Sequence, residues 1–256
     1  MKDFPWLKKY PKGVAHEIQL NEYPSLVELF EESFKKYGDQ VAYENMGVKL
    51  TYRQLDILSG HFAAFLQKDL RLTKGERIAI QMPNLLQFPI AFMGAIRAGL
   101  VVVNTNPLYT PREMEYQFKD AEISAIVIVA NFCFNLEKVL TNTTIKHIII
   151  TQLGDMLGPL KGALVNFVVK KVKKMVPEYH IPQAIFFKDA LKKGSSLELT
   201  KPKIEIEDIA VLQYTGGTTG VSKGAQLSHF NIIAHNSMIT QWFKPYMNTN
   251  GGNIMV

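Results

Sequence analysis

The sequence predicts an α/β protein: layered, mostly parallel sheets flanked by helices. Short apolar runs bounded by turn residues recur along the chain, and segments with helix-start signals separate them. Strands that are buried on both faces have continuous apolar sequences, and parallel strands need a crossover segment between them. A chain of 256 residues can form one large domain or two small ones.

Three segments in the first half of the chain begin like helices. Each has Ser or Thr followed three residues later by Glu or Gln, the spacing of a capping box, in which both side chains bond free backbone N–H groups. The pairs are Ser25 with Glu28, Thr51 with Gln54, and Thr110 with Glu113. Pro111 would occupy the first helical position, where its missing N–H costs nothing. We expect a helix after each pair.

Five apolar runs are the expected strands. They cover residues 77–82, 100–103, 124–129, 147–150 and 209–214. No run approaches the roughly 18 apolar residues of a membrane-spanning helix, and the N-terminus lacks the apolar core of a secretion signal. The single cysteine, Cys133, cannot form an intrachain disulfide. We therefore expect a cytoplasmic protein.

The net charge of +6 comes mostly from one segment. On a helix through residues 160–176, Lys170, Lys171, Lys173 and Lys174 cluster on one side, and most of the apolar residues, including Leu164, Val172 and Met175, lie on the other. One interpretation is a helix on an anionic membrane surface, at the inner face of the membrane. The favoured alternative is an ordinary surface helix whose apolar stripe lies in the core. A nucleic-acid partner is not expected, because the basic residues do not spread over a broad face.

The expected strand at 209–214 leads directly into a segment rich in glycine and threonine, residues 215–225 (TGGTTGVSKGA). Glycines let backbone N–H groups turn toward a bulky anion, threonine hydroxyls add neutral donors, and the lysine adds a positive charge. The spacing fits neither the Walker loop, where lysine directly follows the second glycine, nor the dinucleotide-binding fingerprint. The segment therefore predicts a loop that holds a polyphosphate.

This segment resembles the phosphate-binding motif of the adenylate-forming superfamily, which includes the acyl-CoA synthetases. Similar elements of that superfamily occur at residues 50–55 (LTYRQL) and 97–107. The form YTGGTTGV followed by LSHFN at 227–231, together with residues 164–180, is most similar to bacterial long-chain fatty-acid–CoA ligases. The resemblance extends over essentially the whole chain.

The resemblance implies a reaction in two steps, in which ATP and a long-chain fatty acid form an acyl-adenylate and coenzyme A then takes the acyl group. Mg²⁺ is the implied metal, with no ligand assigned in this chain, and no catalytic residue is assigned. The implied nucleotide-binding residues are Tyr214, Thr215, Gly216, Gly217, Thr218, Thr219, Gly220, Val221, Ser222, Lys223, Gly224 and Ala225. Within this set, the threonines would supply hydroxyls, the first three glycines would supply backbone N–H groups, and Lys223 would supply charge.

The superfamily's motifs for magnesium and ribose and its lysine-bearing C-terminal lid do not occur in this sequence. We therefore expect the N-terminal part of an adenylation domain, inactive alone. Residues 1–200 would form a first α/β subdomain, and 201–256 would carry the phosphate loop and the start of the next. Two alternatives stay open: a non-catalytic module that binds nucleotide or membrane, and a ligase with another acid specificity. A homodimer is also left open.

Overall fold

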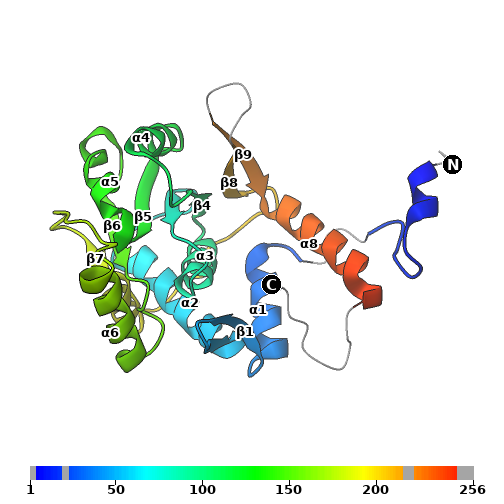
Figure 1. Cartoon of the computed structure of the whole chain (residues 1–256). Helices are drawn as coiled ribbons and strands as arrows, with labels where there is room; N and C mark the ends of the chain where they lie inside the picture. The colour runs from blue at the N-terminus through cyan, green and yellow to red at the C-terminus, as the bar shows by residue number, and fades with distance from the viewer. Residues whose placement is uncertain (1–3, 19–22, 216–221, 247–256) are drawn as a thin grey trace.

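A computed structural model describes residues 4–18, 23–215 and 222–246. Its centre is a seven-stranded sheet with the order β7-β6-β5-β3-β4-β8-β9 (Figure 1). The strands are β3 (Arg77–Gln81), β4 (Val101–Asn104), β5 (Ile123–Val129), β6 (His147–Thr151), β7 (Ile185–Phe186), β8 (Ile209–Thr215) and β9 (Lys223–Ser228). All neighbours are parallel except β8 and β9. The expected mostly parallel sheet is confirmed, and each predicted strand is present to within two residues.

Helices cover both faces of this sheet. On one face lie α1 (Leu26–Tyr37), α2 (Tyr52–Lys68), α3 (Gln87–Arg97) and α7 (Phe187–Gly194), and on the other lie α4 (Pro111–Asp120) and α5 (Cys133–Glu137). Alternate residues of β3 enter the two cores: Ile78 and Ile80 pack with the first group and Ala79 with the second. The residues of β3 are therefore apolar on both faces, as a sheet covered on both sides requires.

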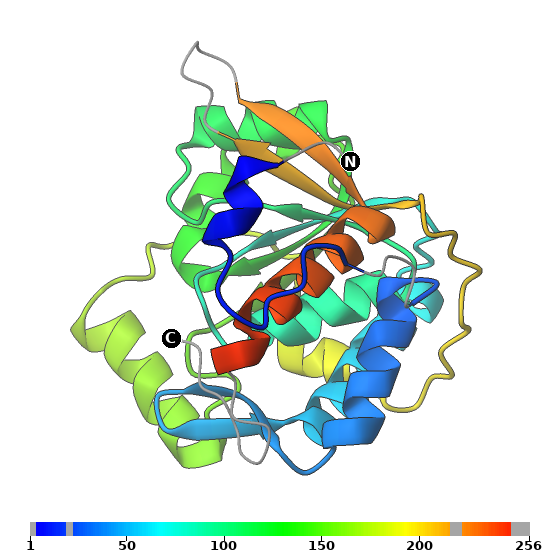
Figure 2. The ribbon, with the colours of Figure 1, turned by 90° about the vertical axis from the view of Figure 1, so that its right-hand side faces the viewer.

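The remaining elements lie around this centre. A small antiparallel sheet joins β1 (Val41–Asn45) and β2 (Val48–Thr51), with Met46 and Gly47 at its turn. The other helical segments are η1 (Pro5–Lys9), η2 (Ala130–Phe132), η3 (Leu140–Asn142), α6 (Pro159–Phe167), η4 (Val168–Val172), α8 (His229–Phe243) and η5 (Lys244–Tyr246). Helix α8 follows β9 and lies beside α1 (Figure 2). No helix in the described ranges is long and apolar enough to cross a bilayer.

Two of the three expected capping boxes are formed. Thr51 with Gln54 begins α2, and Thr110 with Glu113 begins α4. At α1 the prediction is wrong in detail: the Ser25 hydroxyl accepts from the N–H of Val27 and donates to the Glu28 carboxylate. Because the Glu28 side chain bonds that hydroxyl, Ser25 caps the helix without a reciprocal pair.

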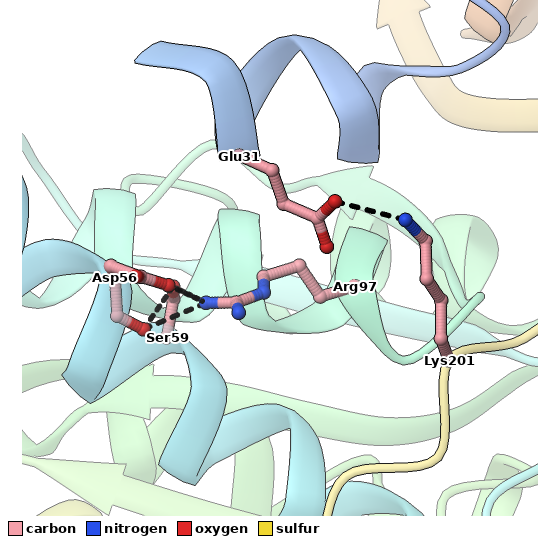
Figure 3. A network of polar contacts seen from close by, with 5 residues as sticks. All are labelled: Glu31, Asp56, Ser59, Arg97 and Lys201. Carbon is pink, nitrogen blue, oxygen red and sulfur yellow. Dashed lines mark hydrogen bonds and ion pairs between the residues drawn. The ribbon is translucent and has the colours of Figure 1, made fainter. Parts of the chain in front are cut away.

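Arg97, at the end of α3, joins three helices. Its Nη1 donates to the backbone oxygen of Asp56 (2.7 Å) and to the Ser59 hydroxyl (2.8 Å), both on α2 (Figure 3). The same nitrogen lies 2.9 Å from the Asp56 carboxylate, and the guanidinium faces the ring of Phe34 on α1. Lys201 lies in the segment between α7 and β8 and forms an ion pair with Glu31 (2.9 Å), which connects this segment to α1.

The segment 160–176 differs from the expected single amphipathic helix. Regular helix ends at Phe167, and a π-helical turn follows, closed by the N–H of Lys173 on the oxygen of Val168 (2.7 Å). The expectation that the apolar side lies in the core is wrong for Leu164, Val172 and Met175, which are exposed. Gly162 and Asn166, rather than these three apolar side chains, contact Gly154 and hold α6 to the rest of the chain.

The strands before and after residue 200 share one sheet, because β8 pairs with β4 from Val102–Val211 to Asn104–Gln213. The glycine- and threonine-rich segment therefore starts at the carboxyl end of a strand of the main sheet. A separate unit that starts at residue 201 stays a prediction.

Candidate functional site

The candidate site lies where β3, β4 and β8 end. These strands are parallel, so their carboxyl ends meet at one edge of the sheet. The chain runs from β3 to β4 on one side and then crosses back to β5 on the other side of β3. In open α/β sheets, the carboxyl edge near such a reversal is the usual place for a ligand.

A cavity of about 450 Å³ opens at this edge. Its walls come from the ends of the three strands and from the segments that follow them. The lining residues are Ile80, Met82, Phe88, Asn104, Thr105, Asn106, Tyr109, Gln213 and Tyr214. The cavity therefore adjoins the residue from which the glycine- and threonine-rich segment departs.

Strands β8 and β9 form the base of that segment. Thr215 pairs with Lys223 in the antiparallel ladder, and the Ser222 hydroxyl donates to the backbone oxygen of Thr215 (2.9 Å). Of the predicted nucleotide-binding residues, Tyr214, Thr215, Ser222, Lys223, Gly224 and Ala225 lie at this base. The others, Gly216, Gly217, Thr218, Thr219, Gly220 and Val221, lie outside the described residues.

Tyr214 fixes this base to the neighbouring helix. Its hydroxyl donates to the carboxylate of Asp120, the last residue of α4. Burial and this negative charge raise the pKa of Tyr214 far above its usual value, so the phenol stays protonated. Tyr214 also pairs in register with Gly224, where an added Cβ would lie 2.9 Å from the tyrosine ring. Glycine at 224 thus makes room for the ring.

Lys223 supplies an unengaged positive charge beside the loop. Its side chain is exposed, and it makes no hydrogen bond or ion pair with any residue that the structure describes. An ammonium group on a flexible stem can follow an anion that approaches the loop. Lys223 is the first residue of β9, within the glycine- and threonine-rich segment, and its charge-supplying role stays a prediction.

Buried amides at the same edge were missed in the sequence. Gln81 ends β3, Asn104 ends β4, and Gln117 lies on α4. The Gln117 amide donates to the backbone of Asn104 (3.1 Å), and the Asn104 amide donates to the side chain of Gln213 (3.0 Å). The side-chain oxygens of Gln81, Asn104 and Gln117 have no partner within the described part of the chain.

Buried acceptors without partners in the protein call for a donor from water or a ligand. The sequence did contain a signal for two of them, since Gln81 and Asn104 are polar residues that close otherwise apolar strands. Gln117 gave no such signal, because its helix has polar residues on most of its surface.

His229 and Cys133 have side chains that could take part in catalysis, but their contacts are those of packed structural residues. The Nδ1 of buried His229 accepts the N–H of Leu26 (3.1 Å) and so joins the start of α8 to the start of α1. Cys133 is fully buried, and burial raises the pKa of its thiol to about 12. A thiol of this kind is a packed side chain rather than a nucleophile.

Relatives of known name share much of the sequence. A long-chain-fatty-acid–CoA ligase of Escherichia coli O157:H7 is 52% identical over 242 residues, which are 94% of this chain and 43% of that protein. A protein of the same name from Bacillus subtilis is 37% identical over 93% of this chain and 42% of its own length. The chain thus spans less than half the length of these relatives.

Solved structures share the fold. A long-chain-fatty-acid–CoA ligase from Archaeoglobus fulgidus superposes with a TM-score of 0.66 at 20% identity, covering 91% of this chain and 42% of that one. A structure from Rhodopseudomonas palustris, named a putative long-chain-fatty-acid CoA ligase, superposes with a TM-score of 0.69 at 18% identity. The superposition covers 86% of this chain and 48% of that one. Residues 30–256 also match the family model described as AMP-binding enzyme. With most of its length matched, the chain belongs to the AMP-binding enzyme family.

Proposed function

We propose that this chain serves the ATP-dependent activation of a long-chain fatty acid and its transfer to coenzyme A. The observation that carries the proposal is the 52% identity, over 94% of this chain, to a ligase with that name. The exposed Lys223 beside a loop at the carboxyl edge of a parallel sheet supports the nucleotide half of the reaction. The preference for long-chain acids rests on the relatives alone.

The reaction proceeds by two displacements. A fatty-acid carboxylate oxygen attacks the α-phosphorus of ATP, and the bond to the β,γ-diphosphate breaks to release pyrophosphate. The thiol of coenzyme A then loses its proton and attacks the acyl carbonyl carbon, and AMP leaves with the carboxylate oxygen. Positioning and charge stabilisation dominate the catalysis of such transfers.

Lys223 would stabilise the negative charge that gathers on the leaving pyrophosphate. The hairpin base holds this lysine next to the loop through the Thr215 pairing and the Ser222 hydrogen bond. Mg²⁺ would neutralise further charge. The described residues contain no group of three or more His, Cys, Asp or Glu that could hold a metal. The phosphates of ATP would supply ligands to this ion, as substrate phosphates commonly do.

The test is fatty-acid-dependent exchange of labelled pyrophosphate into ATP, measured with the protein expressed from its own gene. Loss of one charge-stabilising group commonly costs about 10²–10³-fold, and we expect Lys223→Ala to lower kcat/KM for ATP by that order. Fatty-acid binding should stay within about twofold, because the lysine acts on the phosphates. The matched control is Lys188→Ala, an exposed lysine on α7.

Each result has a clear meaning. Unchanged nucleotide kinetics in the Lys223 variant would contradict the charge-supplying role. Binding of ATP without any exchange, in the unaltered protein, would favour a non-catalytic nucleotide-binding module. Exchange driven by short or aromatic acids in place of palmitate would keep the reaction and change the substrate. A cytoplasmic location and a homodimer stay predictions.

A further inference from the structure

Helix α6 (Pro159–Phe167) carries large apolar side chains on the face that points away from the protein. Leu160, Leu164 and Phe167 on α6 are 87%, 63% and 58% exposed. Spacings of four and three residues place them on one face of the helix. Figures 1 and 2 both show α6 at the periphery of the molecule. Three large apolar side chains therefore form a row that faces away from the protein.

The inward face of α6 carries small and polar residues and one half-buried apolar side chain, Val165, which packs against the core. Gly162 packs so closely on Gly154 that an added Cβ would lie 2.3 Å from the Gly154 oxygen. Asn166 accepts the N–H of Gly154 (2.7 Å) and donates to Asp155 (3.3 Å). Surface helices of globular proteins normally bury their apolar side. Here the larger apolar side chains, Leu160, Leu164 and Phe167, are turned outward, and exposed apolar patches mark interaction sites.

A cluster of positive charge continues this row. Lys170, Lys171, Lys173 and Lys174 are all exposed, and none of their side chains makes an ion pair or hydrogen bond within the described ranges. The sequence has no acidic residue from 156 to 177. Val172 and Met175, which are 64% and 53% exposed, stand among the lysines. Apolar and cationic side chains thus share one continuous segment.

We propose that residues 160–175, the α6 surface, bind the surface of an anionic lipid bilayer. The apolar side chains would enter the boundary between headgroups and acyl chains, and the lysines would stay among the anionic phosphates. A nucleic acid would use the lysines but leave the apolar row in water. The surface also includes the tip of the β1–β2 turn, since Lys161 donates to the backbone oxygen of exposed Met46. The proposal is independent of the ligase reaction.

Co-sedimentation with vesicles tests the charged half, using the protein expressed from its own gene. The vesicles are phosphatidylcholine alone or with phosphatidylserine. Each lysine near an anionic surface changes the partition coefficient about fivefold, so replacing Lys170, Lys171, Lys173 and Lys174 by Gln should lower binding by nearly three orders of magnitude, about 600-fold. The matched control replaces four other exposed lysines, which are Lys35, Lys146, Lys188 and Lys192. That control should bind like the unaltered protein.

The apolar half needs a separate variant. Replacing Leu160, Leu164 and Phe167 by Ser should lower vesicle binding about tenfold or more, since each buried apolar side chain contributes. The positions are exposed, so unfolding curves should match those of the unaltered protein. A fluorophore on Leu164→Cys should shift to the blue on phosphatidylserine vesicles, whereas one on Lys188→Cys should not. Cys133 is buried and does not compete with the introduced thiol for the fluorophore.

Three outcomes would overturn the proposal. Equal losses in the two lysine variants would show that net charge, and not this surface, governs binding. Undiminished binding of the serine variant, with no spectral shift at position 164, would show that the apolar row stays outside the bilayer. Binding to homopolymeric RNA without binding to phosphatidylserine vesicles would assign the lysines to a nucleic acid.

Discussion

Replacing Gly224 by Ala tests how the β8–β9 hairpin at the base of the predicted phosphate-binding segment is packed. The new Cβ would lie 2.9 Å from two carbons of the Tyr214 ring and 3.2 Å from its oxygen. Glycine at this position does not adopt a left-handed backbone, so alanine adds no backbone strain. The change therefore isolates a steric contact between two strands.

The ring has little freedom to move away. Tyr214 is buried, and its hydroxyl is held by Asp120 across 94 positions of sequence. A ring displaced to restore ordinary contact would lengthen that hydrogen bond. Overpacking of this kind typically costs about 1–3 kcal/mol, and we expect Gly224→Ala to lower the free energy of unfolding by that amount.

A double-mutant cycle in urea gives the measurement. Gly224→Ala is compared in the unaltered protein and in Tyr214→Ala, where no ring opposes the added methyl group. The cost should fall close to zero in the second background, so the coupling energy should equal about 1–3 kcal/mol. Ala225→Ser, at the exposed neighbouring position, is the control and should stay within about 0.5 kcal/mol.

The reasoning would be refuted by equal costs of Gly224→Ala in both backgrounds. A single variant as stable as the unaltered protein would refute it as well. Pyrophosphate exchange should also fall in the Gly224 variant, because a displaced Tyr214 moves the strand that carries Thr215. Full stability with lost exchange would place the effect in the loop and not in the contact.

Three further predictions concern the stability and reactivity of the core. Burial lowers the pKa of His229, so its stabilising effect is present above the unfolded pKa of about 6.5 and is lost as the pH falls from there through the lower pKa of the folded state. Urea midpoints at pH 8 and pH 5 should therefore differ less in His229→Gln. Arg97→Met removes two hydrogen bonds and an ion pair and should cost about 1–3 kcal/mol, with Arg97→Lys restoring only part. Cys133 should react with a thiol reagent only as fast as the protein unfolds, and rapid labelling under native conditions would contradict its burial.

Local signals predicted the strands and most of the helix starts. Continuous apolar runs such as residues 124–129 mark strands buried on both faces, and the Thr51 and Thr110 caps depend on residues only three positions apart. Both kinds of signal act within a few residues, so one sequence is enough to find them. Strand β7 was not anticipated because it has only two residues. Strand β9 and the β1–β2 pair were not anticipated because their sequences mix polar and apolar residues.

Contacts between distant segments could not be predicted in this way. The sequence shows that residues 160–176 have an apolar and a basic side, but not which side meets the protein. The close approach of Gly162 to Gly154 decides this, and it needs the β6 strand and the turn after it to be in place. The pairing of β8 with β4 and the hydrogen bond from Tyr214 to Asp120 likewise join segments about a hundred residues apart.

These distant contacts also hold the two strand ends that flank the glycine-rich residues 216–221. Glycine and threonine allow backbone and hydroxyl groups to adapt to a phosphate, but such residues provide few packing contacts of their own. The paired strands β8 and β9, on either side of these residues, do make packing contacts with the rest of the protein. Tyr214 is held by Asp120 at the end of α4, and α4 is fixed at its start by the Thr110 cap. Because neither Asp120 nor Thr110 belongs to the predicted phosphate motif, the placement of Tyr214 and Thr215 depends on residues that the sequence pattern does not include.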